Sequence, residues 1–130
     1  MAIGTAQELT SITSSGNYYL TGDVTLTENE AWKPADGVVL CLNGCDITMN
    51  GVGYAIYVRE GYTFTLCDCK GGGKGGGKIT HTKGVDGRGV YVVGFFNMYG
   101  GSISGNSAQW GSGVCLDNGK KGTVFNMYGG

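Results

Sequence analysis

The residues that could carry out catalysis gather around the single histidine of the chain. His81 is followed closely by Asp86 and Arg88. An arginine can remove the proton next to a sugar carboxylate when clustered acidic residues hold Ca²⁺ beside it. Between residues 61 and 116 only Asp68 and Asp86 are acidic, which is too few for a Ca²⁺ site or for the facing carboxylates of a glycosidase. We therefore predict no catalytic residue, no metal and no cofactor, with His81 on an ordinary alternating strand.

Five cysteines could form disulfides or bind a metal. Cys41 and Cys45 lie close together in the sequence, as do Cys67 and Cys69, while Cys115 stands apart. Zinc sites usually contain a C-x₂-C spacing, which this chain lacks. If the protein is exported, we expect one or two disulfides among the first four cysteines and a free thiol at Cys115. Otherwise the cysteines pack as small apolar residues.

A glycine-rich run with three lysines, residues 70–78, could bind an anionic polymer. Lys74 and Lys78 are its candidate ligand-binding residues, and an acidic polysaccharide is the partner that they would suit. The run matches part of a phosphate-binding loop, but Ile79 stands where that loop needs Ser or Thr. The alternative, which we favour, is an extended corner between two repeats.

Aromatic residues are the better candidates for binding a ligand. Tyr57 and Tyr91 occupy equivalent positions of a repeat, as do Tyr99 and Tyr128, and Trp110 lies at a corner. Rings in line on an outer surface can stack on sugars, because each ring presents an apolar face and a polar tip. The alternative, again the one that we favour, is that the tyrosines stack on one another and stiffen the fold.

The composition of the chain indicates an all-β protein with many turns. Of its 130 residues, 27 are glycine and one is proline, and charged residues make up 15%. This excludes collagen, a coiled coil and a helical bundle. The net charge of −1 argues against a nucleic-acid partner, and no apolar stretch is long enough to span a membrane.

An internal repeat is the strongest signal in the sequence. The six residues Phe96–Gly101 recur letter for letter as Phe125–Gly130. Each copy follows a short apolar strand, so the unit is strand, turn, strand and a glycine corner. Two weaker copies cover residues 40–51 and 56–66. Because one unit is too small to bury its apolar face, the units must stack side by side.

Stacking the four copies aligns sixteen apolar positions. The expected columns are Leu40, Ile56, Val90 and Val114; Leu42, Val58, Val92 and Leu116; Ile47, Phe64, Phe96 and Phe125; and Met49, Leu66, Met98 and Met127. Polar residues alternate with them, as in a strand that is buried on one face. Among these, Asn97 and Asn126 should form a ladder of side-chain amides.

The run from Phe96 to Ala108 resembles the repeats of right-handed parallel β-helices, the pectin-lyase-like regions of large bacterial surface proteins. The resemblance covers residues 37–130 and implies a solenoid of short stacked coils. Residues 1–36 would then form an N-terminal cap and the first coil. We expect a short helix over residues 6–13 with Thr5 as its N-cap.

The resemblance implies a function that is structural or adhesive. We expect a fragment of a longer exported bacterial protein, located at the cell surface after removal of its signal peptide. Its coil would act as a rigid stalk or bind carbohydrate weakly, without catalysis. Two alternatives stay open: a polysaccharide lyase-like enzyme with its cleft over residues 81–88, and a module that forms homo-oligomers through its last coil.

Overall fold

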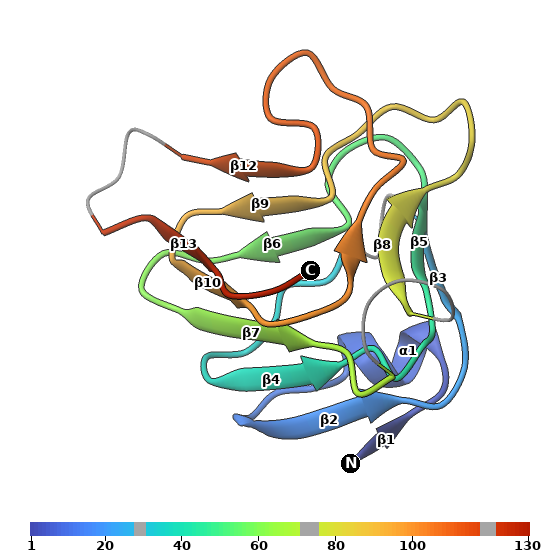
Figure 1. Ribbon diagram of the computed structural model, residues 1–130, viewed down its shortest axis with the longest axis vertical. Coiled ribbons are helices and arrows are strands. Elements are labelled where there is room, and N and C mark those ends of the chain that lie inside the picture. Colours follow the sequence, from blue (N-terminus) through green and yellow to red (C-terminus); the bar gives the residue numbers. More distant parts are fainter. Residues whose placement is uncertain (28–30, 71–75, 118–121) are drawn as a thin grey trace.

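The computed structural model describes residues 1–27, 31–70, 76–117 and 122–130 (Figure 1). Its secondary structure consists mostly of short strands arranged in parallel sheets, with one short helix among the described residues. The predicted all-β class is confirmed. Within the described residues, no helix has both the length and the apolar character needed to cross a membrane.

The described residues form three sheets, and every paired neighbour in them is parallel. Sheet I contains, in spatial order, β1 (Ala2–Ile3), β2 (Gly16–Leu20), β4 (Val38–Cys41), β7 (Thr63–Cys67), β10 (Phe95–Met98) and β13 (Val124–Met127). Sheet II contains β11 (Ser102–Ile103), β8 (Lys78–His81), β5 (Ile47–Asn50) and β3 (Val24–Thr27). Sheet III contains β12 (Val114–Leu116), β9 (Val90–Val92) and β6 (Ile56–Val58).

From β4 onward, the chain passes through the sheets in a fixed order. It runs through sheet I, then sheet II, then sheet III, and returns to sheet I one strand further along. The preceding segment follows the same order, because β2 and β3 are succeeded by Trp32, which forms a parallel bridge to Ile56 beside sheet III. From β4 onward, each passage therefore adds one strand to each sheet.

The core lies between the three sheets and is built by alternation along each strand. In β7 the side chains of Phe64 and Leu66 are fully buried, whereas their neighbours are only half-buried. Phe96 stacks on Phe64 on one side and on Phe125 on the other, with ring centroids 5.7 and 5.1 Å apart. Burial of such large rings is a major favourable contribution to folding.

In each of the four predicted columns, three of the four members are confirmed. The registers align Ile56 with Val90 and Val114 in sheet III. They align Phe64 with Phe96 and Phe125 in sheet I. The expected amide ladder is present as well.

The predicted alignment of the copy nearest the N-terminus, residues 40–51, with the other three copies is wrong. Leu40 pairs with Leu66 in sheet I, not with Ile56. Ile47 pairs with Ile79 in sheet II, not with Phe64. The physical reason is that each passage contains three strands, whereas the predicted unit contained two. Short apolar strands resemble one another, so the sequence pattern did not reveal the omitted strand.

The N-terminal segment adds strands and one helix to this arrangement. Helix α1 (Ala6–Thr10) is shorter than expected, and its N-cap is Thr5, whose hydroxyl accepts a 3.1 Å hydrogen bond from the backbone of Glu8. The buried side chain of Leu9 holds the helix against the core. Strand β2 pairs directly with β4. The division of the chain at residue 36 stays a prediction.

Candidate functional site

The structure distributes the predicted ligand-binding residues over three outer surfaces. Tyr57 and Tyr91 are adjacent on the outside of sheet III. Tyr99 and Tyr128 lie together beyond the ends of β10 and β13 of sheet I. Lys78 begins β8 of sheet II. Lys74 lies outside the described residues, and Trp110 lies in the segment that leads to sheet III.

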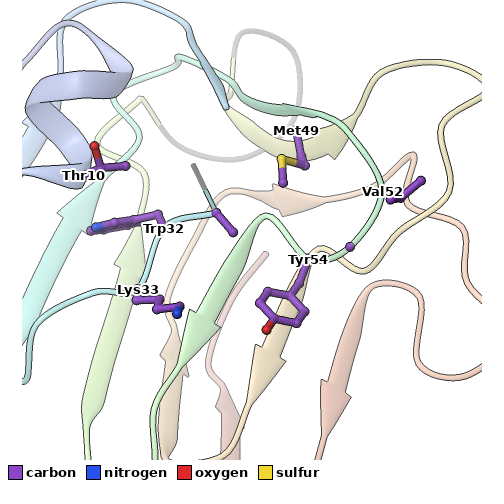
Figure 2. Close-up of a pocket in the computed structure, with 8 residues that line it drawn as sticks. Thr10, Trp32, Lys33, Met49, Val52 and Tyr54 are labelled. Atoms are coloured by element: carbon purple, nitrogen blue, oxygen red, sulfur yellow. The ribbon is translucent and has the colours of Figure 1, made fainter. Parts of the chain in front are cut away.

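Three tyrosines cluster on the outside of sheet III. Tyr54 stacks on Tyr91 with ring centroids 5.4 Å apart and 17° between the planes. Tyr57 contacts both rings, at centroid distances of 5.3 and 5.5 Å. The ammonium of Lys33 lies 5.8 Å from the centre of the Tyr57 ring. Lys33 and Tyr54 both line the pocket drawn in Figure 2. Sequence reasoning missed Tyr54, because it precedes the strand and belongs to no repeat column.

A cavity of about 340 Å³ adjoins this cluster, and we name it the upper cavity. It is lined by Arg88, Tyr91, Trp110, Cys115, Leu116 and Asp117. The Arg88 Nε–H donates a 3.0 Å hydrogen bond to the Trp110 carbonyl. The same guanidinium lies 5.7 Å from the centre of the Tyr91 ring. Arg88 thus ties the segment that carries Trp110 to the tyrosine cluster, while the Trp110 side chain stays 69% exposed.

Tyr91 and Asp117 are joined in the same cavity. The Tyr91 hydroxyl donates a 2.7 Å hydrogen bond to the Asp117 carboxylate. This bond, with smaller contributions from burial and the negative charge of Asp117, raises the pKa of Tyr91 to about 12. At neutral pH the cavity therefore contains a guanidinium, a carboxylate and a protonated phenol beside an exposed indole. Such groups can hydrogen-bond a polar ligand and contact its apolar face.

The tyrosine pair on sheet I has a different geometry. Tyr99 and Tyr128 stack with centroids 4.7 Å apart and 18° between the planes. Stacking covers one face of each ring, and both residues otherwise stay exposed. This matches the alternative in which tyrosines stack on one another. The upper cavity differs, because no other aromatic ring stacks on the Trp110 indole in the described part of the chain.

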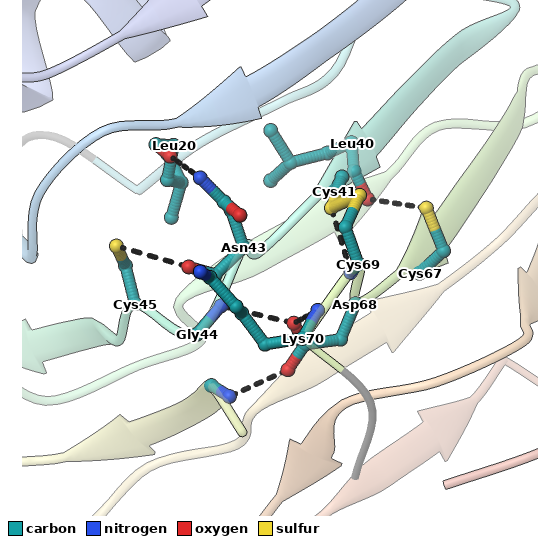
Figure 3. Close-up of a disulfide and its surroundings, with 11 residues drawn as sticks. Leu20, Leu40, Cys41, Asn43, Gly44, Cys45, Cys67, Asp68, Cys69 and Lys70 are labelled. Atoms are coloured by element: carbon teal, nitrogen blue, oxygen red, sulfur yellow. Dashed lines mark hydrogen bonds between the residues drawn. A yellow bond between two sulfur atoms is a disulfide. The ribbon is translucent and has the colours of Figure 1, made fainter. Parts of the chain in front are cut away.

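One disulfide is present among the four cysteines considered for pairing (Figure 3). It joins Cys41 to Cys69, which are 28 residues apart. The inclusion of Cys45 and Cys67 among the disulfide residues was wrong, because both are free thiols, as is Cys115. Cys67 instead points its sulfur at the Leu40 carbonyl, 3.6 Å away. The sequence alone could not show whether Cys67 or Cys69 pairs with Cys41, because these two cysteines are only two residues apart.

Two of the free thiols, Cys45 and Cys67, are poorly suited to nucleophilic attack. Burial, followed by the nearby Asp68, raises the pKa of the Cys67 thiol. Burial is also the largest cause of the raised pKa of Cys45, and three aspartates contribute to it, Asp23, Asp46 and Asp68. A thiol with a raised pKa contains little thiolate at neutral pH.

The lysine-rich run is held at its two ends by one carboxylate. Asp68 accepts hydrogen bonds from the backbone N–H groups of Lys70 and Gly77, at 3.1 and 2.6 Å. It also accepts one from Gly44, at 2.9 Å (Figure 3). The Lys78 backbone N–H bonds to Asp46 at 3.2 Å, while its side chain is exposed. These contacts agree with a corner between strands.

His81 lies in the interior, at a corner between sheets II and III. It is buried, and its ring nitrogens lie 2.6 Å from the Asn106 side-chain oxygen and 2.8 Å from the Gly53 carbonyl. A side chain added at Gly87 would collide with the same ring. The contacts give His81 a structural role that joins three segments. Among the described residues, no three His, Cys, Asp or Glu side chains gather into a possible metal site.

No family model, curated protein or solved structure matches the chain. We therefore infer its function from the geometry of its own residues. The upper cavity combines a cationic, an anionic and two aromatic side chains, Arg88, Asp117, Tyr91 and Trp110.

Proposed function

We propose that the chain is a segment of a right-handed parallel β-helix that binds carbohydrate, without catalysis, in the upper cavity. The single observation that carries the binding proposal is the exposed Trp110 indole beside Arg88 and the Tyr91–Asp117 pair. An exposed indole is costly to keep in water, and it is held here among groups that can hydrogen-bond hydroxyls.

The order of the strands supports the β-helix. Each passage through sheets I, II and III adds one strand to each sheet in register. A solenoid produces this order, because its coils stack one on another. The proposed right hand follows from the strong preference for right-handed crossovers between parallel strands and from the resemblance of the repeat.

The chemistry of the upper cavity suits one or two sugar rings. A sugar ring has an apolar face, formed by its C–H groups, and hydroxyl groups around its edge. The indole of Trp110 would contact the apolar face. The Arg88 guanidinium would donate hydrogen bonds to the hydroxyl groups, and the Asp117 carboxylate would accept hydrogen bonds from them. Its volume of about 340 Å³ lies at the small end for ligand sites, which suits weak binding repeated along a longer coil.

An exported location is part of the proposal. The Cys41–Cys69 disulfide favours an oxidising compartment, because disulfides are rare in reducing cytosol. Surface polysaccharides are found in the same compartment, and they are the partners that the cavity would meet there.

A second candidate function, assembly through the last strands, rests on a different observation. Leu116 and Met127 are exposed, although the equivalent residues one strand earlier, Val92 and Met98, are buried. Apolar residues at an open sheet edge favour pairing with another chain. Sedimentation of the purified chain over a range of concentrations tests this: association that Met127→Lys abolishes supports it, and a monomer at every concentration contradicts it.

A glycan array that includes acidic plant and bacterial polysaccharides tests carbohydrate binding. The wild-type chain, Trp110→Ala and Tyr99→Ala should be compared, since Tyr99 is also an exposed aromatic residue but lies on another sheet. We expect binding that Trp110→Ala removes and Tyr99→Ala preserves. Absorbance of the unsaturated product should be recorded in parallel, because its appearance would replace this proposal with a lyase. Absence of binding would leave a structural stalk.

A further inference from the structure

Asparagine is followed directly by glycine at two places in the described part of the chain, Asn43-Gly44 and Asn50-Gly51. A third such pair, residues 118–119, lies outside it. An asparagine before glycine can lose its side-chain amide without an enzyme, because glycine has no side chain to hinder attack by its own backbone nitrogen. The attack requires this nitrogen to reach the asparagine side chain. Hydrogen bonds that hold either group in place therefore oppose the reaction.

The first pair is held firmly. Asn43 and Gly44 form a turn in which both residues have positive φ, 52° and 77°. The Asn43 side-chain amide donates a 3.0 Å hydrogen bond to the Leu20 carbonyl, and the Gly44 backbone N–H donates a 2.9 Å hydrogen bond to Asp68 (Figure 3). Both groups that would have to react are thus tied to neighbouring segments.

The second pair is held much less. Asn50 is the exposed last residue of β5, and Gly51 begins the turn toward β6 that carries Val52 and Tyr54 (Figure 2). Within the described residues, neither the Asn50 side chain nor the Gly51 backbone N–H makes a hydrogen bond. The attacking nitrogen and the side chain that it would attack are therefore both able to move.

We propose that Asn50 is a site of spontaneous deamidation in the folded protein and that the fold protects Asn43 from the same reaction. The Gly51 backbone nitrogen forms a bond to the side-chain carbonyl carbon of Asn50. Its proton leaves with the side-chain amide as ammonia, and a succinimide ring closes. Water then opens the ring at either carbonyl, which gives aspartate or isoaspartate. The reaction consumes one water and releases one ammonia, with no change in oxidation state.

The products alter the molecule beside the tyrosine cluster. Aspartate adds a negative charge at the exposed end of β5. Isoaspartate adds a carbon atom to the main chain directly before the turn in which the Gly53 carbonyl faces His81 and the Tyr54 ring stacks on Tyr91. The proposal does not depend on carbohydrate binding, because neither reacting residue lines the upper cavity.

Peptide mass spectrometry of the full chain, held in warm and mildly alkaline buffer, tests the proposal. Loss of ammonia and gain of water change the mass of each converted peptide. An isoaspartate methyltransferase detects the product that forms through the succinimide. We expect conversion at Asn50 to be at least roughly tenfold faster than at Asn43, a factor that corresponds to about 1.4 kcal/mol. Equal rates at the two sites, or no conversion at Asn50, would overturn the proposal.

Unfolding the chain separates the effect of the fold from that of the local sequence. In urea, with the Cys41–Cys69 disulfide reduced, Asn43 and Asn50 should convert at similar rates, because no hydrogen bond then protects Asn43. If Asn43 stays as slow in urea as in the folded protein, its sequence neighbours cause the difference and the proposal is wrong.

Gly51→Ala is the matched variant, because Gly51 does not have a positive φ and the added methyl group hinders the attack. In the folded protein it should slow conversion at Asn50 and leave the rate at Asn43 unchanged. An unchanged rate at Asn50 would contradict attack by the Gly51 nitrogen and indicate direct hydrolysis by water.

Discussion

The Asn126 side chain donates a 3.0 Å hydrogen bond to the side-chain oxygen of Asn97, its partner on the neighbouring strand of sheet I. The two residues are equivalent members of the six-residue repeat. Their contact shows that identical side chains are placed above one another when the strands stack in parallel. The relationship links the repetition in the sequence directly to the register of the fold.

Asn97→Ala should lower the free energy of unfolding by about 0.5–1.5 kcal/mol, because it removes one half-buried side-chain hydrogen bond. Asn17→Ala is the matched control, since Asn17 lies in the same column of sheet I but is exposed. Urea denaturation measures both. Equal losses in the two variants would show that the amide ladder adds nothing to stability.

Phe96→Ala should destabilise the protein by about 3–5 kcal/mol, because it leaves a cavity between the rings of Phe64 and Phe125. Its neighbour Phe95 points outward and is 37% exposed. Phe95→Ala should therefore cost much less. Thermal unfolding of both variants measures the two losses of stability. A greater loss from Phe95→Ala would mean that the strand has the opposite face in the core.

The hydrogen bond between Tyr91 and Asp117 predicts a dependence of stability on alkaline pH. Because the folded pKa of Tyr91 is raised from 10.0 to about 12, folding favours the protonated phenol. The stabilisation is complete below pH 10 and is lost as the pH rises toward 12. Asp117→Asn should bring the pKa of Tyr91 back toward 10.0 and remove this part of the pH dependence. Ultraviolet titration of tyrosinate, together with stability measured across this pH range, provides the test. Superimposable titration curves for the two proteins would contradict it.

Cys69→Ser should reduce the free energy of unfolding by about 3–4 kcal/mol, since the Cys41–Cys69 disulfide closes a loop of 28 residues. Cys115→Ser should have a small effect, because Cys115 is a free thiol. Denaturation with and without reductant measures the difference. If reductant leaves the stability of the wild-type chain unchanged, the disulfide does not form in solution.

The fold was predictable where repetition was strong. The identical copies at Phe96 and Phe125 determined the register of β10 and β13, because equivalent residues of identical copies pair with each other in stacked parallel strands. Further upstream the copies diverge, and the spacing between equivalent strands varies. Leu40 and Ile56 then look alike as members of short apolar strands, although they belong to different sheets. Only pairing in space distinguishes them.

The candidate sites were only partly predictable, because they lie where the repeat is interrupted. Tyr91 and Trp110 were found through their residue types, yet Arg88, which connects them, was considered only as a catalytic group. Trp32 belongs to no repeat column, and nothing in its neighbours indicated that its indole is buried. Cavities form between segments that are distant in sequence, so their linings leave no local pattern.

The central claim, carbohydrate binding at Trp110, is tested most directly by a titration that follows both indole N–H signals. The glycan with the strongest array signal should be added to the wild-type chain and to Arg88→Gln, which removes the guanidinium beside Trp110. We predict that the Trp110 signal shifts and saturates while the Trp32 signal stays in place, and that Arg88→Gln weakens the binding. A glycan that binds without shifting the Trp110 signal, or no glycan that binds at all, would contradict the account.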